Sequence, residues 1–161
     1  MAQEYPNLKI TVQDLPKCGP DFAKAVPEEL KDRVTFQAHS FLEPQPTQAD
    51  IFVFKYIMID WNDVMAERIV RSLIPALRPG NKVVVMELAS IKFPPGVPMP
   101  RAMSRSMTAG DMRMMSLFGQ SERSPEQIVK LFTNVDERFE VVKLDLESAP
   151  RMLLLEMVWR G

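Results

Sequence analysis

The chain of 161 residues contains very little of several residue types on which binding and catalytic sites often depend. It has one cysteine, Cys18, which cannot form an internal disulfide and so indicates a reducing compartment. It has one histidine, and its six glycines nowhere form a Gly-x-Gly-x-x-Gly loop. No apolar run reaches the length of a membrane span, and the N-terminus lacks the pattern of a signal peptide. These absences predict a cytoplasmic protein.

The chain also lacks a large excess of positive or negative charge. The net charge is -1, and no cluster of lysine and arginine forms a basic stripe, so we expect no nucleic-acid or membrane partner. A hydrophobic share of 46% with 25% charged residues is ordinary for a folded globular protein, and the length suits one domain. No motif indicates a metal site.

What the chain does contain is an alternation of apolar, β-branched runs with helical patterns, which predicts an α/β domain. Residues 51–54 and 83–86 are apolar at every position, as central parallel strands are. The last two runs are expected to form an antiparallel closing pair. The predicted strands are residues 8–12, 34–38, 51–57, 82–87, 139–144 and 152–159.

Helix signals lie between these runs. Asp60 is a candidate N-cap for a helix with an apolar residue at every fourth position, ended by Arg78, Pro79 and Gly80. Ser124 to Gln127 predicts a capping box with proline at the first position of a helix running to about Val135. The apolar positions of these two helices are Trp61, Met65, Ile69, Leu73 and Leu77, and then Ile128, Leu131 and Phe132.

The proline-rich residues 91–100 are expected to form an extended crossing segment. After it, Met103, Met107, Met114 and Met115 fall near one face of a further predicted helix. They either pack in the core or line an adaptable apolar pocket.

A series of short segments resembles, in order, the landmarks of class I S-adenosylmethionine-dependent O-methyltransferases of the caffeic-acid and fungal sterigmatocystin types. The resemblance covers nearly the whole chain, and the ordered set is far more specific than any single member. The segments are Tyr5-Pro6-Asn7-Leu8, Val12-Gln13-Asp14-Leu15-Pro16, Arg33-Val34-Thr35-Phe36, Phe41-Leu42-Glu43-Pro44-Gln45-Pro46, Asp60-Trp61-Asn62-Asp63, Leu77-Arg78-Pro79-Gly80-Asn81-Lys82, Glu87 and Gly119-Gln120-Ser121-Glu122-Arg123.

By this resemblance, residues 1–161 form a single, incomplete Rossmann-like methyltransferase domain, mostly a parallel sheet with a C-terminal antiparallel strand pair. The family's dimerisation domain, first strand and glycine-rich loop would precede residue 1, and residues 1–6 would be the tail of the next helix. That first strand lies between the strands matching residues 8–12 and 51–57. Either these two strands pair directly or another polypeptide supplies the strand, because open apolar edges recruit partners. We therefore expect a marginal or oligomeric chain, a homo-oligomer or a complex with a full-length relative.

The resemblance also implies cofactor-binding residues. Asp14, at the end of its strand, would hold the ribose hydroxyls of S-adenosylmethionine, although it could simply begin a turn before Pro16. Ser40 stands where fungal relatives usually have an aspartate beside the adenine, and Phe41 follows it. Lys55 matches a lysine that lines the same site in the plant enzymes, or it is a solvated residue at a strand end.

The catalytic position departs from the family. The family's base is a histidine oriented by carboxylates that match Glu87 and Glu122, and this chain has Ile59 in its place, which has no proton acceptor. Glu87 or Glu122 could act as the base if burial raised its pKa. His39 belongs to a different strand end and is interpreted as a loop residue rather than a relocated base.

Three functions remain open at this point. The first is S-adenosylmethionine-dependent methyl transfer to a small hydroxylated aromatic or polyketide-like substrate of secondary metabolism, impaired by Ile59. The second is a non-methylating member of the family that guides pericyclic or cyclisation reactions or is inactive. The third is an interaction protein that docks through its open sheet edges.

Overall fold

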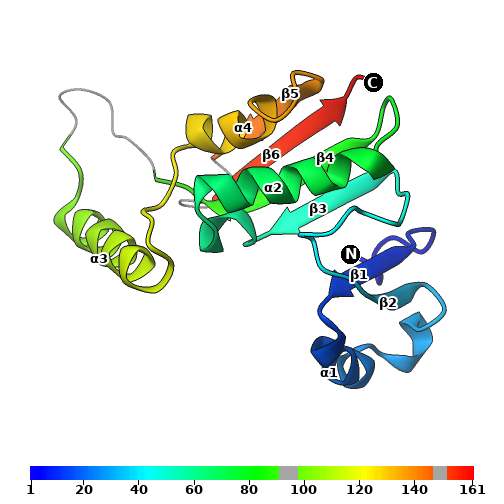
Figure 1. Ribbon diagram of the computed structural model, residues 1–161. Coiled ribbons are helices and arrows are strands. Elements are labelled where there is room, and N and C mark those ends of the chain that lie inside the picture. The colour runs from blue at the N-terminus through cyan, green and yellow to red at the C-terminus, as the bar shows by residue number, and fades with distance from the viewer. Residues whose placement is uncertain (91–97, 147–151) are drawn as a thin grey trace. The chain divides into compact units, whose positions relative to one another are not determined.

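The computed structural model describes residues 1–90, 98–146 and 152–161, which divide into two compact units, Met1–Pro44 and Gln45–Gly161 (Figure 1). The expected extended segment at residues 91–100 falls largely outside the described residues. Among the residues described, no helix is both long enough and apolar enough to cross a membrane.

The first unit is built on two parallel strands, β1 (Ile10–Asp14) and β2 (Val34–Ala38), paired from Ile10 opposite Val34 to Asp14 opposite Ala38. Helix α1 (Gly19–Ala25) connects them, flanked by the 3₁₀ turns η1 (Pro16–Cys18) and η2 (Glu28–Leu30). The strand predicted at residues 8–12 therefore begins two residues later. Residues 1–5 form a single turn in which the N–H of Tyr5 donates to the carbonyl of Met1.

The second unit is a four-stranded sheet with its helices. Its strand order is β3-β4-β6-β5, with β3 parallel to β4 and β6 antiparallel to both β4 and β5, which confirms the predicted closing pair. Its elements are β3 (Ile51–Lys55), η3 (Met58–Asp60), α2 (Asp63–Leu73), η4 (Ile74–Ala76), β4 (Lys82–Leu88), α3 (Arg101–Phe118), α4 (Pro125–Thr133), β5 (Phe139–Asp145) and β6 (Met152–Trp159).

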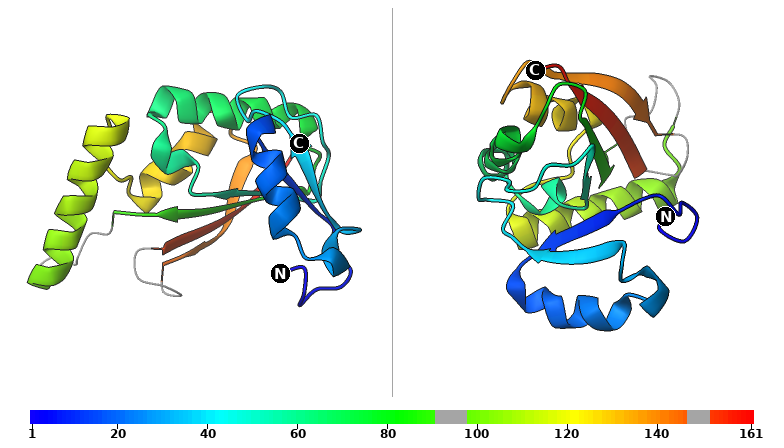
Figure 2. Two further views of the ribbon diagram at one scale, coloured as in Figure 1. Left: turned by 90° about the horizontal axis from the view of Figure 1, so that it is seen from below. Right: turned by 90° about the vertical axis from the view of Figure 1, so that its right-hand side faces the viewer.

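Helices α2 and α4 lie on the same side of this sheet (Figure 2). Each buries its apolar face there, as the spacing predicted, with Ile69 and Phe132 almost fully inaccessible. A series of edge-on aromatic contacts runs through the core, with ring centroids 6.4 Å apart for Phe54 and Phe132, 5.5 Å for Phe132 and Phe139, and 4.8 Å for Phe139 and Trp159. This core makes the second unit a well-packed α/β layer structure.

Strand β3 does not occupy the central position that its composition predicted. It is the end strand of the four-stranded sheet, and the side chains of Ile51 and Val53 are 48% and 54% exposed. Its neighbour β4 does lie inside the sheet. Strands β1 and β3 belong to separate sheets, one in each unit.

Helix α2 begins two residues later than predicted. Its N-cap is Asn62, whose side-chain oxygen accepts the N–H of Met65 at 3.0 Å, whereas Asp60 closes the preceding 3₁₀ turn η3. Trp61 and Leu77 therefore lie outside the helix. Asp60 was a plausible cap by residue type, but the backbone at residues 57–60 makes contacts with residues far away in the sequence.

The remaining helices follow their local signals closely. Helix α4 has the predicted capping box, with Ser124 accepting from the N–H of Gln127 and Gln127 accepting from the N–H of Ser124, although the helix ends at Thr133 rather than near Val135. In α3, Met107 and Met114 are buried, which favours core packing of the two alternatives for these residues. Met115 is 54% exposed, so it does not belong to the buried face.

Candidate functional site

The first unit places its predicted cofactor residues at one end of its two strands. Asp14 ends β1, and the N–H of His39, just past β2, donates to the Asp14 carbonyl at 2.9 Å. The Asp14 carboxylate is exposed, and one oxygen accepts the N–H of Leu15 at 2.7 Å. A carboxylate has further lone pairs beyond this bond, so it retains the capacity to accept from sugar hydroxyls.

Ser40 and Phe41 follow directly and are both half-buried. The Ser40 hydroxyl oxygen accepts the N–H of Leu42 at 3.3 Å, which leaves its proton available for donation. The Nε2 atom of His39 is buried and has no hydrogen-bond partner among the described residues. A donor, an acceptor and an unsatisfied polar atom therefore gather at the strand end where open α/β sheets bind nucleotides, and these residues fit an adenosine.

In the second unit, β3 ends at Lys55, which is exposed, with its ammonium 5.8 Å from the centre of the Tyr56 ring. Tyr56 has a φ of 54°, the single non-glycine residue with positive φ in the described chain. Its N–H still donates to the carbonyl of Met86 at 2.9 Å. The left-handed conformation costs about 1–2 kcal/mol and turns the chain sharply from β3 into η3.

The turn after Tyr56 is held by a buried carboxyl group. One oxygen of Glu87, on β4, accepts the N–H groups of Ile57 and Met58, both at 2.8 Å. Glu87 is 1% exposed, and its other oxygen, Oε2, is buried without a hydrogen-bond partner among the described residues. An unsatisfied buried carboxyl oxygen is costly, so this atom marks a site for a proton, a water molecule or a ligand.

Burial raises the pKa of Glu87 to about 7, well above its ordinary value of 4.5. The two backbone hydrogen bonds oppose this shift, nearby Asp60 adds to it by like-charge repulsion, and Arg123 opposes it. Glu87 therefore changes charge near neutral pH, where a general base is most effective.

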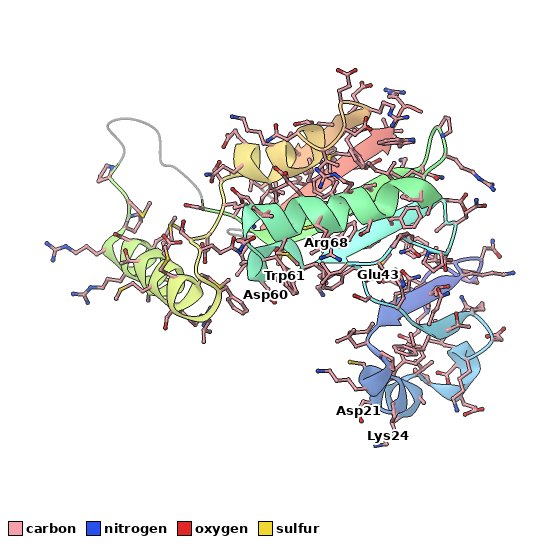
Figure 3. The ribbon with its side chains drawn as sticks, viewed as in Figure 1. Asp21, Lys24, Glu43, Asp60, Trp61 and Arg68 are labelled. Carbon is pink, nitrogen blue, oxygen red and sulfur yellow. The ribbon has the colours of Figure 1, made fainter. Side chains whose placement is uncertain are left out.

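Arg123 holds the same turn from the opposite direction, and sequence reasoning missed it. Its guanidinium is buried and donates to the carbonyls of Met58 and Trp61, each at 2.6 Å. Its Nε donates to the carboxylate of Asp63 at 2.9 Å, which ties the turn to the first residue of α2. Figure 3 labels Trp61 beside the N-terminal end of this helix.

Gln120 completes the set of contacts. Its side-chain nitrogen donates to the carbonyl of Ile59 at 2.5 Å, and its oxygen accepts from Arg123 at 2.7 Å. Glu122, the second carboxylate predicted for the catalytic position, is buried, and its backbone N–H donates to the Asp111 carboxylate at 3.0 Å. Arg123 and Gln120 belong to the motif from Gly119 to Arg123, which was the sequence signal for this segment.

A small cavity adjoins the Glu87 carboxyl, with a volume of about 10 Å³. This volume suits about one water molecule and is much too small for an aromatic substrate. The structure thus brings Ile59 and Glu87 to one cavity, and Glu122 is not part of its described wall. The cavity is lined by Met58, Ile59, Glu87, Leu88, Ser121, Arg123 and Ile128.

Comparison with known sequences gives one consistent result. The pattern of the O-methyltransferase domain family matches residues 1–136. The O-methyltransferase lcsG of Purpureocillium lilacinum is 40% identical over 163 residues, which cover 100% of this chain and 34% of the relative. The chain thus spans about a third of the length of this curated relative.

Solved structures share the fold. The O-methyltransferase NcsB1 of neocarzinostatin biosynthesis, solved with S-adenosylmethionine and 2-hydroxy-5-methyl naphthoic acid, superposes with a TM-score of 0.77 at 23% identity, over 98% of this chain and 43% of that one. A pericyclic reaction enzyme superposes with a TM-score of 0.80, also at 23% identity, over 99% of this chain and 39% of the other. The incomplete Rossmann-like methyltransferase fold is therefore confirmed.

Proposed function

Because the chain belongs to the O-methyltransferase domain family, we propose that it is part of an S-adenosylmethionine-dependent protein of small-molecule biosynthesis whose methyl transfer to a hydroxyl is impaired. The identity of 40% to a fungal O-methyltransferase supports the family activity. The proposed impairment rests on one observation: Ile59, which cannot accept a proton, lines the small cavity beside Glu87.

The proposed cofactor contacts lie at the strand ends. Asp14 would accept from ribose hydroxyls, and Ser40 and Phe41 would contact the adenine. Lys55, at the end of β3, is the candidate from the second unit. S-adenosylmethionine supplies a methyl group made electrophilic by its sulfonium centre. The acceptor is proposed to be a small hydroxylated aromatic or polyketide-like compound, in line with the naphthoic acid bound to NcsB1.

Removal of the hydroxyl proton is the step that this chain performs poorly. The acceptor oxygen must lose its proton as it bonds to the methyl carbon, and the side chain of Ile59 cannot accept a proton. Glu87 has the pKa of a useful base, but its cavity admits about one water molecule. The carboxyl of Glu87 thus has room beside it for about one water molecule, and Glu122 is a second buried carboxyl. A missing general base typically costs about 10²–10⁴-fold in rate.

The test is an Ile59→His variant assayed beside the wild type with S-adenosylmethionine and a panel of phenols. Ile59→Leu serves as the matched control, because it changes shape without adding a proton acceptor. We expect all three proteins to bind the cofactor in calorimetry, and Ile59→His alone to methylate faster than the wild type, by about 10²-fold or more. Fast methylation by the wild type would contradict the impairment.

A non-methylating role is the second candidate, favoured by Ile59 and by the shared fold with a pericyclic reaction enzyme. Such a reaction rearranges bonds within one substrate and needs no proton acceptor at position 59. Turnover of an unsaturated substrate by the wild type and by Ile59→Leu, with no methylated product, would select this role.

We also propose that β3 pairs with a strand of a second copy of this chain. The two outer strands of the four-stranded sheet differ. Strand β5 carries exposed charges at Glu140 and Lys143 and an irregular register beside Lys143, all of which discourage pairing, whereas residues 51–54 of β3 are uncharged.

Sedimentation tests this contact with a closely matched pair of variants, since Val53 and Val142 are both 54% exposed. We expect Val53→Lys to lower the association constant at least about tenfold and Val142→Lys to leave it unchanged. A wild-type chain that sediments as a monomer at micromolar concentration would refute self-association. A stable complex with a longer relative instead would assign the edge to that partner.

A further inference from the structure

The turn at residues 57–61 is held in an unusual way, because side chains from two other segments take up its main-chain groups. Glu87 accepts the N–H groups of Ile57 and Met58 from the β4 side. From the other side, Arg123 and Gln120 bond the carbonyls of residues 58, 59 and 61. The Met58 residue is thus bonded through its N–H to a carboxyl and through its C=O to a guanidinium.

These contacts are all made to main-chain groups of the turn, so none of them depends on which side chain stands at position 59. Buried charge-assisted hydrogen bonds are about twice as strong as neutral ones, and both faces of this turn have them. At position 59, the residue's own carbonyl and the main-chain groups of its neighbours are all held by these hydrogen bonds. A backbone held in this way keeps its Cα position when the side chain is changed.

We propose that Arg123 and Gln120 are positioning residues, which fix the backbone at position 59 so that its side chain faces the Glu87 carboxyl across the small cavity. This inference deepens the proposed function and rests on it for its biological meaning. In this arrangement the backbone at position 59 is oriented independently of the side chain that it carries.

The charge balance around the cavity agrees with this role. The carboxyl of Glu87 faces Asp60 and Arg123, and Arg123 is itself paired with Asp63, at 2.8 Å from Nη2. Gln120 is neutral. The hydrogen bonds of Arg123 and of Gln120 can therefore be weakened separately, by substitutions that leave the net charge at the cavity unchanged.

The experiment uses the Ile59→His variant as a probe of geometry. The wild type has one histidine, so the new imidazole gives the single additional histidine signal in an NMR titration. A carboxylate within about 4–6 Å raises an imidazole pKa, so we expect a value about one unit above its ordinary value of about 6.5. Adding Glu87→Gln should remove the increase, which would show that Glu87 causes it.

The positioning role is tested by adding Arg123→Lys or Gln120→Met to Ile59→His. Both changes conserve charge, but lysine lacks the planar fork that bonds several acceptors at once, and methionine cannot donate to the carbonyl of residue 59. We expect the imidazole pKa to return most of the way to about 6.5 in the first variant and part of the way in the second. Arg68→Lys, a matched change on the exposed surface of α2 (Figure 3), should leave it raised.

The result that overturns the proposal is an imidazole pKa that is not raised, or that stays equally raised in both scaffold variants. If Arg123→Lys does not fold, the milder Gln120→Met still decides the question, with thermal melting to confirm folding. The readout does not depend on turnover. A raised and scaffold-dependent pKa without methyl transfer would refute the proposed activity and leave the positioning role intact.

Discussion

The two units of this protein differ in how much they bury. In the second unit, Val83, Leu155 and Phe132 belong to a continuous core that involves two helices and all four strands. In the first unit, the hydrophobic residues that are buried are Ala2 and Leu30. Both units have α/β architecture and parallel strands, so secondary structure alone does not distinguish them.

The difference shows that the second unit is stabilised by a buried apolar core, whereas the first depends more on strand pairing and hydrogen bonds such as those from Arg33 to the carbonyls of Ala2 and Leu8. The rings of Phe22 and Phe36 in the first unit contact each other in a tilted arrangement, with centroids 5.4 Å apart. Gly19 packs closely on the Phe36 ring. All of these residues are only half-buried. Stabilisation by burial is roughly proportional to the apolar area removed from water, so the second unit accounts for most of the folding free energy.

The largest effect is expected from truncating an aromatic ring in each unit. Phe132→Ala removes a fully buried ring and should cost about 3–5 kcal/mol of unfolding free energy. Phe36→Ala removes a half-buried ring and should cost roughly 1 kcal/mol. Urea unfolding is the measurement, followed by tryptophan fluorescence, because both tryptophans belong to the second unit. A fluorescence transition that shifts in Phe36→Ala as well would mean that the two units unfold together.

A smaller effect is expected from pH, and it belongs to the second unit alone. Because Glu87 has a folded-state pKa of about 7 against an ordinary 4.5, the folded protein binds its proton more tightly than the unfolded chain. The resulting stability is fully present below about pH 4.5 and is lost as pH rises through about 7, by an amount on the order of 3 kcal/mol. Chemical unfolding at a series of pH values should show this slope in the wild type and not in Glu87→Gln. The exposed Glu137→Gln should retain it.

The smallest effect compares helix ends. Ser124→Ala removes half of the capping box of α4 and should cost about 1 kcal/mol. The N-cap position of α1 is Cys18, whose side chain caps nothing, so Cys18→Ala should change the stability by less than about 0.5 kcal/mol. Thermal melting of both variants measures the difference. An equal loss in the two would show that the capping contacts do not operate as described.

Much of the fold could be predicted because its signals are local. The strands at residues 34–38 and 152–159 have the predicted bounds, and the capping box of α4 is formed by residues three apart. The turn before β4 has its glycine, Gly80, at a φ of 90°, where other residues are strained. Each of these features depends on residue types within one or two turns of chain.

The site was less predictable because its contacts are distant in sequence. Asp60 failed as a helix cap because the turn containing it is held by Glu87. Arg123 went unrecognised because the two carbonyls that it bonds, those of Met58 and Trp61, lie more than 60 positions away. The sequence also gave no sign that β3 would be an end strand with half-exposed side chains, since its composition suits a buried strand equally well.

The amino-acid sequence by itself determined the family, the order of the elements and the loss of a proton acceptor at position 59, since all three are properties of residue identity and spacing. Only the tertiary structure decided that Glu87 titrates near neutral pH and that Arg123 and Gln120 hold the turn beside it. The physical reason is that burial and hydrogen bonding depend on which distant groups meet. These contacts form only when β4 and residues 120–123 pack around the turn at residues 57–61.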